Sequence, residues 1–134
     1  MTSITAKYAG HLRCEAQHAP SGSTLITDAP TDNAGKGEAF SPTDLVATAL
    51  ITCMLTVMGI QAQKMRKELQ ARGEVHKHMR ANPRHIGKLE VTLWAETGAF
   101  TPEQKQLLEQ VARACPVAMS LLENTEQDVQ IVCR

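Results

Sequence analysis

Four cysteines carry the most reactive chemistry that this sequence offers. They are widely spaced, without a C-x-x-C pair, and they are Cys14, Cys53, Cys115 and Cys133. This spacing fits neither a zinc ribbon nor a small secreted scaffold held together by disulfides. The N-terminal residues also lack the apolar core of a signal peptide. We therefore expect a cytoplasmic, reducing setting, in which a functional cysteine is more often catalytic than structural.

Two of these thiols differ in their local sequence. Cys115 directly precedes Pro116 inside an otherwise helical pattern. We expect the helix to break there and restart with Cys115 as its cap, because proline suits the first helical position. Backbone N–H groups at such a helix start favour a thiolate. Cys53 lies in a long apolar segment that disfavours the charged form. Local sequence alone thus predicts that Cys115 is the more activated thiol. Cys53 could equally be an inert, buried side chain that packs as a small apolar residue.

The segment after residue 40 predicts a long helix that carries Cys53. Ser41 suits the N-cap, Pro42 suits the first helical position, and Asp44 follows three residues after the cap. Residues 45–63 contain no charge and are apolar on every face, which indicates a central buried helix or a membrane span. Threonines and a glycine interrupt the run, so we expect a core helix of about two dozen residues and no membrane span.

The rest of the sequence predicts short strands and a second helix. Alternating apolar and polar residues predict strands at 4–8, 12–16, 24–27, 69–76, 89–96 and 129–132. Residues 29–40 read as a loop, and a capping-box pattern at residues 101–104 opens the second helix. The order of these elements predicts one α+β domain over residues 1–134, unlike the regular alternation of a Rossmann-like fold.

Two motifs resemble the OsmC/Ohr family of thiol peroxidases. The run from Ser41 to Met54 places Cys53 eleven residues after Pro42, and Cys115-Pro116 falls near the end of the next helix. The leading strands and the loop before the helix are also similar, so the resemblance spans essentially the whole chain. It implies an OsmC-like fold, with antiparallel sheets wrapped around two central helices in an intertwined homodimer.

The resemblance also implies an enzyme that reduces organic hydroperoxides, and hydrogen peroxide as a further substrate. In that chemistry Cys53 attacks the peroxide and becomes a sulfenic acid, and Cys115 then forms a disulfide with it. An external dithiol reduces the disulfide, and members of the family use lipoylated proteins for this step. The resemblance implies no cofactor and no metal.

In members of this family, an arginine activates the attacking cysteine. A glutamate directly after the helix-opening proline orients this arginine. That position holds Thr43 here, and the N-terminal region contains one arginine, Arg13. Lys36 and Glu38 lie in the loop before the helix. We therefore expect Arg13 and Glu38 to act at the site, with Lys36 as the alternative cation. One of the two cations is expected to approach Cys53, across the dimer if the chains intertwine.

Rival interpretations rest on other surfaces. Residues 64–88 hold eight basic against two acidic residues, although the whole chain balances 14 basic with 14 acidic side chains. This segment could bind an anionic partner, but only Trp94 is near for base stacking, so we expect a solvated surface and no nucleic acid. His76 and His78 share a strand face without further metal ligands. The main alternative is a non-catalytic dimer that binds a small hydrophobic ligand. Cys14 and Cys133 are assigned no role.

Overall fold

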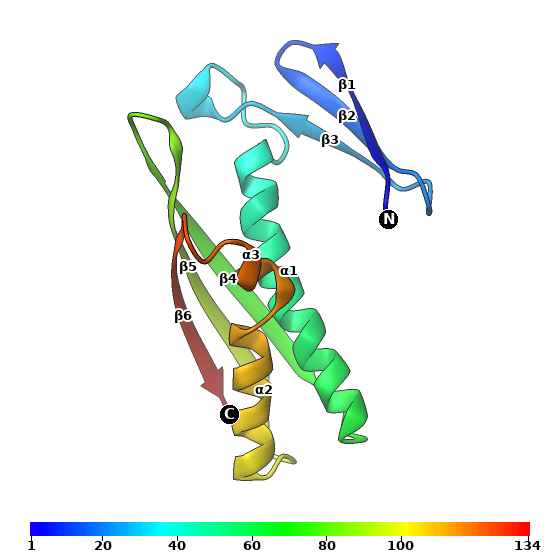
Figure 1. The fold of residues 1–134 in the computed structure, drawn as a ribbon, viewed down its shortest axis with the longest axis vertical. Coiled ribbons are helices and arrows are strands. Elements are labelled where there is room, and N and C mark those ends of the chain that lie inside the picture. Colours follow the sequence, from blue (N-terminus) through cyan, green and yellow to red (C-terminus); the bar gives the residue numbers. More distant parts are fainter. The chain divides into compact units, whose positions relative to one another are not determined.

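The computed structural model describes the whole chain, residues 1–134, as two compact units (Figure 1). The first unit comprises residues 1–46 and the second comprises residues 47–134. The long helix α1, Pro42–Lys64, begins in the first unit and runs into the second. The expectation of one domain over residues 1–134 stays a prediction.

A three-stranded antiparallel sheet forms most of the first unit, as the sequence predicts. Its strands are β1 (Ile4–Gly10), β2 (Arg13–His18) and β3 (Thr24–Asp28), in the order β1-β2-β3. The register alternates two faces, because successive side chains of a strand point to opposite sides. One face carries mainly apolar side chains, namely those of Ile4, Ala6, Tyr8, Ala16 and Leu25.

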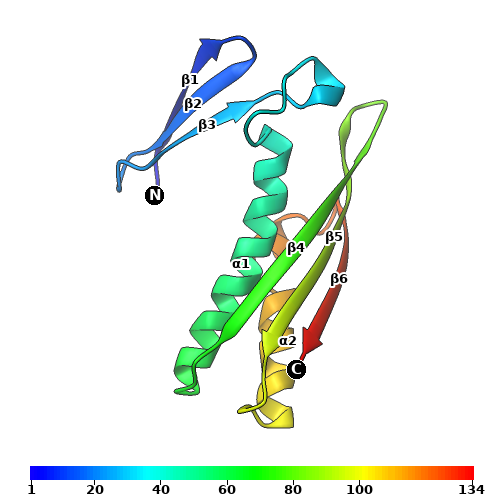
Figure 2. The same ribbon diagram turned by 180° about the vertical axis from the view of Figure 1, so that it is seen from behind.

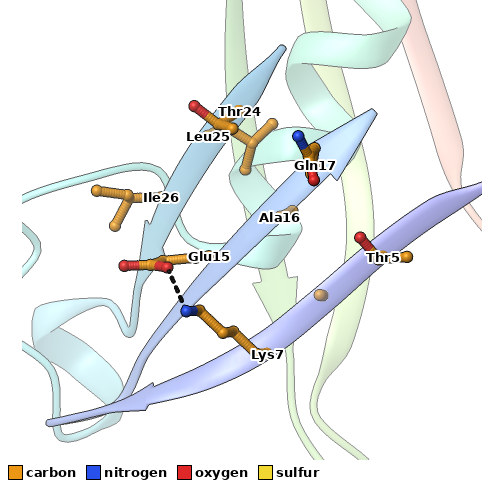
Figure 3. Close-up of a pocket in the computed structure, with 9 residues that line it drawn as sticks. Thr5, Lys7, Glu15, Ala16, Gln17, Thr24, Leu25 and Ile26 are labelled. Carbon is orange, nitrogen blue, oxygen red and sulfur yellow. Dashed lines mark ion pairs between the residues drawn. The ribbon is translucent and has the colours of Figure 1, made fainter. Parts of the chain in front are cut away.

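The opposite face of this sheet is polar and carries an open pocket (Figure 3). Lys7, Glu15 and Ile26 are direct cross-strand neighbours there. Lys7 Nζ lies 3.3 Å from Glu15 Oε2, and both side chains are exposed. Exposed ion pairs of this kind contribute little to stability, so the pocket is a solvated surface feature.

The predicted loop after β3 folds back compactly on itself. It contains one short 3-10 helix, η1, at Thr31–Asn33. Gly35 has no room for a side chain, since an added Cβ would collide with the backbone of Ala29. Its N–H donates to the Pro30 carbonyl oxygen, and the Asp28 N–H donates to the Phe40 carbonyl oxygen at 3.1 Å. These contacts fix the path of the chain past Glu38 toward α1.

The start of α1 is capped as the sequence predicts. Ser41 Oγ accepts a hydrogen bond from the Asp44 N–H at 3.1 Å, and Asp44 Oδ2 accepts one from the Ser41 N–H at 2.9 Å. The two residues satisfy each other's backbone donors, as in a capping box. The helix has 23 residues, which agrees with the expected length.

The burial of side chains along α1 differs from the expectation of a helix that is buried on every face. Its buried residues form a single stripe, Ala47, Leu50, Met54, Met58 and Ala62. On the other side, Thr52, Thr56 and Ile60 are exposed, and both threonine hydroxyls donate to carbonyl oxygens one turn earlier. By length and composition alone α1 could cross a membrane, a test that the core helix of a soluble protein also passes.

The second unit packs helices against one face of a mixed three-stranded sheet (Figures 1 and 2). Its strands are β4 (Gln70–Arg80), β5 (His85–Glu96) and β6 (Glu126–Cys133), in the order β4-β5-β6. β4 and β5 pair antiparallel, whereas β6 runs parallel to β5. The α+β class is confirmed, but this sheet is not purely antiparallel, because a helical crossover connects β5 to β6.

Two helices, α2 (Pro102–Arg113) and α3 (Pro116–Ser120), make that crossover. The predicted capping box is present: Thr101 Oγ1 accepts from the Gln104 N–H, and Gln104 Oε1 accepts from the Thr101 N–H. The helix breaks before Pro116, as predicted. Lys67, just after α1, donates to the Ala99 carbonyl oxygen and to Gln104 Oε1, and so ties the end of α1 to the start of α2.

The apolar core of the second unit lies between α1, the sheet and the crossover. It contains buried side chains from α1, from the inward face of β5 and from α2 and α3. α1 approaches the sheet closely at Gly73, where an added Cβ would lie 2.6 Å from Leu93 Cδ2 and 2.7 Å from Ile51 Cδ1. This contact lets α1 pack closely against the sheet in the turn that carries Cys53.

Candidate active site

Cys53 and Cys115 come together in the second unit. Cys53 projects from the middle of α1, and Cys115 lies at the break between α2 and α3. The Cys53 thiol interacts with the Cys115 thiol and raises its pKa, and both are free thiols. Cys115 is 1% exposed and Cys53 is half-buried. The pair predicted from the two motifs is therefore adjacent and reduced in a largely apolar setting.

The backbone around Cys115 has the predicted geometry of a helix cap. Cys115 is extended, with φ −63° and ψ 154°, and Pro116 takes the first helical position of α3. The Ala118 N–H donates to Cys115 Sγ at 3.4 Å. The sulfur thus occupies the place of the oxygen that Ser, Thr or Asp commonly supplies at a helix start.

Burial outweighs this cap in setting the acidity of the Cys115 thiol. Desolvation raises the pKa of Cys115 above its ordinary value of 9.0, and the neighbouring Cys53 thiol raises it further. The backbone N–H groups of Ala118 and Val117 lower the same pKa, as the sequence suggests, but by less. The expectation that Cys115 is the more activated thiol is therefore wrong. The local helix start acts as expected, whereas the depth of burial depends on the tertiary packing.

The predicted charge pair forms in the first unit. Arg13 Nη2 lies 3.0 Å from Glu38 Oε1, with the two side chains 35% and 57% exposed. Lys36 is exposed in the same loop. The arginine and the glutamate expected to act together are in contact, although Thr43 stands where the family has its glutamate. The pair belongs to the first unit and Cys53 to the second, and the approach of a cation to Cys53 stays a prediction.

Sequence reasoning missed a third member of this cluster. Asp28 lies directly opposite Arg13 in the pairing of β2 with β3, and it is 1% exposed. Its Oδ2 lies 3.5 Å from Arg13 Nη2 and accepts a hydrogen bond from the Glu38 N–H at 3.0 Å. The signal available in the sequence was an acidic residue at the end of a strand beside a proline, Asp28-Ala29-Pro30.

The two remaining cysteines stand apart from this pair. Cys14 lies in β2 between Tyr8 and Thr27. Cys133 ends β6 with its Sγ 3.8 Å from Glu109 Oε1. Burial raises the pKa of Cys133, and the Glu109 carboxylate raises it further. Both are free thiols, and neither acquires a role from its surroundings.

The basic segment 64–88 runs from the end of α1 through β4 into β5, and acidic side chains of β5 and β6 accompany it. His78 Nε2 is 2.9 Å from Glu90 Oε1, and Arg80 Nη2 is 3.7 Å from Glu126 Oε2. The Arg72 guanidinium stacks on the Trp94 ring at 4.0 Å. No group of three His, Cys, Asp or Glu side chains could hold a metal ion. This arrangement supports the interpretation as a solvated strand surface.

The fold and the site define an α+β protein that carries two adjacent free thiols on its helices. The sequence model of the OsmC-like protein family matches residues 35–130, which covers both signature cysteines. The chain belongs to this family. No curated protein sequence matches the chain.

Solved structures show the same fold. A Psychrobacter arcticus protein, named as a candidate osmotic stress induced and detoxification response protein, is 41% identical, with a TM-score of 0.90 over 98% of this chain and 96% of its own. The Legionella pneumophila organic hydroperoxide resistance protein OsmC is 20% identical, with a TM-score of 0.71 over 98% and 96% of the two chains. Bacillus subtilis OhrB is 18% identical, with a TM-score of 0.66 over 98% and 97%. At the two lower identities the likeness concerns the fold.

Proposed function

We propose that this chain is a thiol-dependent peroxidase that reduces organic hydroperoxides and also accepts hydrogen peroxide. The observation that carries the proposal is the adjacency of two free thiols, Cys53 and Cys115, on separate helices of the second unit. Membership of a family that includes organic hydroperoxide resistance proteins supports it. We also propose a cytoplasmic location, because the four widely spaced cysteines fit no disulfide scaffold of a secreted protein.

The proposed reaction begins at Cys53. Its thiolate attacks the terminal peroxide oxygen, the O–O bond breaks, and the alkoxide leaves as an alcohol after taking up a proton. Cys53 is now a sulfenic acid. Cys115 attacks this sulfur, an S–S bond forms, and water leaves with the proton of the Cys115 thiol. An external dithiol, such as a lipoylated protein, then reduces the disulfide by exchange and becomes oxidised itself.

The acidities support this division of roles. The raised pKa of Cys115 keeps it protonated near neutral pH, which suits a resolving thiol better than an attacking one. Cys53 requires stabilisation of its thiolate, and we assign this to the positive charge of Arg13, oriented by Glu38 at 3.0 Å. Lys36 remains the alternative cation for this step.

We further propose that the chain works as a homodimer. Two surfaces of the single chain are apolar and uncovered. On the first sheet Ile4 and Tyr8 are 68% and 67% exposed, and on α1 Ile60 is exposed beside the methyl groups of Thr52 and Thr56. Apolar surfaces of this kind mark interfaces, and a second copy would cover the open side of α1. Sedimentation analysis showing a monomer at micromolar concentration would contradict the dimer.

Peroxide consumption in the presence of a dithiol tests the enzyme directly. With cumene hydroperoxide as substrate, we expect Cys53→Ser to lower the rate at least about 1,000-fold, since it removes the attacking atom. Cys115→Ser should still form a sulfenic acid that dimedone traps, but it should not form the disulfide. Cys14→Ser is the matched control and should match wild type. Unchanged rates in both active-site variants would reject the peroxidase and favour a dimer that binds a small hydrophobic ligand.

A further inference from the structure

The family resemblance gives Glu38 as the residue that orients the activating arginine, but it assigns no buried residue that anchors this pair. We propose that Asp28 is this positioning residue, and that it acts on Cys53 through Arg13. The inference rests on the proposed function, because it concerns the cation that the peroxidase needs. It adds a buried carboxylate to a pair that would otherwise consist of two partly exposed side chains.

Both members of the charge pair meet at one oxygen of Asp28. Its Oδ2 lies 3.5 Å from Arg13 Nη2 and accepts the Glu38 N–H at 3.0 Å. The first contact fixes the guanidinium, and the second fixes the loop that presents the Glu38 carboxylate. The 3.0 Å contact between Arg13 and Glu38 thus has a common anchor in Asp28.

Asp28 is buried, whereas its two partners, Arg13 and Glu38, are partly exposed. Glu38 is 57% exposed, and an ion pair at such exposure contributes little and leaves its side chains mobile. Asp28 is 1% exposed, and its own backbone N–H is tied to the Phe40 carbonyl oxygen at 3.1 Å. Asp28 is therefore the member of the cluster with a fixed position. The contact of Arg13 with Oδ2 holds the guanidinium in place relative to Asp28.

The second carboxylate oxygen of Asp28 points to a use beyond folding. Asp28 Oδ1 is buried and has no hydrogen-bond partner. An unsatisfied buried oxygen destabilises the folded protein, and an exception of this kind calls for an explanation. A role in holding a guanidinium would explain the buried carboxylate, because a carboxylate offers two acceptors to the paired N–H donors of an arginine. In this structure Arg13 contacts Oδ2 alone, and Oδ1 remains as an unused second acceptor beside it.

The test combines Asp28→Asn with Arg13→Met in a double-mutant cycle. Asparagine keeps the shape and an acceptor for the Glu38 N–H but removes the charge. We expect Asp28→Asn to lower kcat/KM for cumene hydroperoxide about 10- to 100-fold, as for a misplaced active-site group. It should also shift the pH profile of Cys53 alkylation by iodoacetamide to higher pH. In the Arg13→Met background, the same change should have no further effect on either measurement.

Controls separate this proposal from a general loss of structure and from the proposed function. Glu15→Gln removes a carboxylate from the same sheet, in the exposed pair with Lys7, and should leave both measurements at wild-type values. Equal losses from Asp28→Asn with and without Arg13, or wild-type behaviour of Asp28→Asn, would overturn the positioning role. A wild-type chain without peroxide turnover would overturn the peroxidase instead. The alkylation profile would still decide on Asp28, whose role fails if Asp28→Asn and Arg13→Met both leave it unshifted.

Discussion

The cysteine pair and the cluster around Arg13 lie in different physical environments, one apolar and the other charged. Cys53 and Cys115 lie in the second unit, and Cys115 sits in the apolar core of that unit. The Arg13, Glu38 and Asp28 cluster of the first unit consists of charges, one of them fully buried. The shifts found for Cys115 come from burial, from backbone N–H groups and from the other thiol.

The difference teaches that thiol proximity and thiol activation have separate sources in this chain. The helices of the second unit bring the sulfurs together, and the burial of Cys115 favours the neutral form of that thiol. We propose that the charge for the thiolate is supplied by Arg13 of the first unit, which contacts two carboxylates. The comparison predicts distinguishable effects of substitutions in the two regions. Changes in the Arg13 cluster should alter the reactivity of the thiol, and changes in the second unit should alter packing and the pH dependence of stability.

Among substitutions outside the two active-site cysteines, removal of the arginine should have the largest effect. Arg13→Met is expected to lower kcat/KM for an organic hydroperoxide about 100-fold, as for the loss of one electrostatic contact to a reacting group. Arg13→Lys keeps the charge without the planar fork and should recover only part of the rate. Lys7→Met, in the same sheet, is the matched control and should retain wild-type kinetics. Equal losses in both variants would show that the sheet needs positive charge only in a general sense.

Loss of the close approach between α1 and the second sheet should come next. Gly73→Ala places a methyl group against Ile51 and Leu93, and overpacking of this kind costs about 1–3 kcal/mol. The cost should appear in urea unfolding, together with slower disulfide formation between Cys53 and Cys115. Gly98→Ala, where an added Cβ meets nothing within 4 Å, should change stability by less than about 0.5 kcal/mol. A neutral Gly73→Ala would show that the helix can shift without disturbing the thiols.

The cap of α1 should have a smaller effect that stays with stability. Ser41→Ala removes the acceptor of the Asp44 N–H and is expected to cost about 1 kcal/mol in urea unfolding. Ser41→Gly should cost only a few tenths of a kcal/mol, since glycine is tolerated at this position. If both variants unfolded at the same urea concentration as wild type, the reciprocal contacts of Ser41 and Asp44 would contribute nothing measurable.

The smallest expected effect concerns pH. The pKa of Cys115 is higher in the folded chain than its ordinary value of 9.0, so the unfolded chain releases this proton first as the pH rises. The free energy of unfolding should therefore decline above about pH 9, and the contribution of this thiol is complete below that pH. Cys115→Ser should flatten the decline, and Cys133→Ser should act in the same direction, because the pKa of Cys133 is also raised. A decline of the same steepness in Cys115→Ser would contradict the burial effect.

Local chemistry made much of the fold predictable. The start of α1 at Pro42, the capping box at Thr101 and the break before Pro116 follow from side chains within a few residues of each event. The pairing of Arg13 with Glu38 came from the family resemblance, because residues 25 positions apart carry no local signal of contact. The structure shows Arg13 and Glu38 in contact, and their action on Cys53 stays a prediction.

What escaped sequence reasoning depends on distant parts of the chain. The parallel direction of β6 is set by the crossover through α2 and α3, and alternation within a strand carries no direction. The raised pKa of Cys115 depends on burial by other elements, which outweighs the helix start beside it. Asp28 was missed for the same reason, since an acidic residue at the end of a strand ordinarily faces water.

The sulfur cap of α3 links thiol chemistry to the backbone. The hydrogen bond from the Ala118 N–H ends on Cys115 Sγ, the atom that changes its bonding in the proposed cycle. Formation of the disulfide would fix the orientation of this sulfur, so oxidation would alter the side-chain contact that caps the start of this short helix. The amide hydrogen of Ala118 then becomes a built-in reporter, whose exchange with heavy water would follow the redox state of the protein.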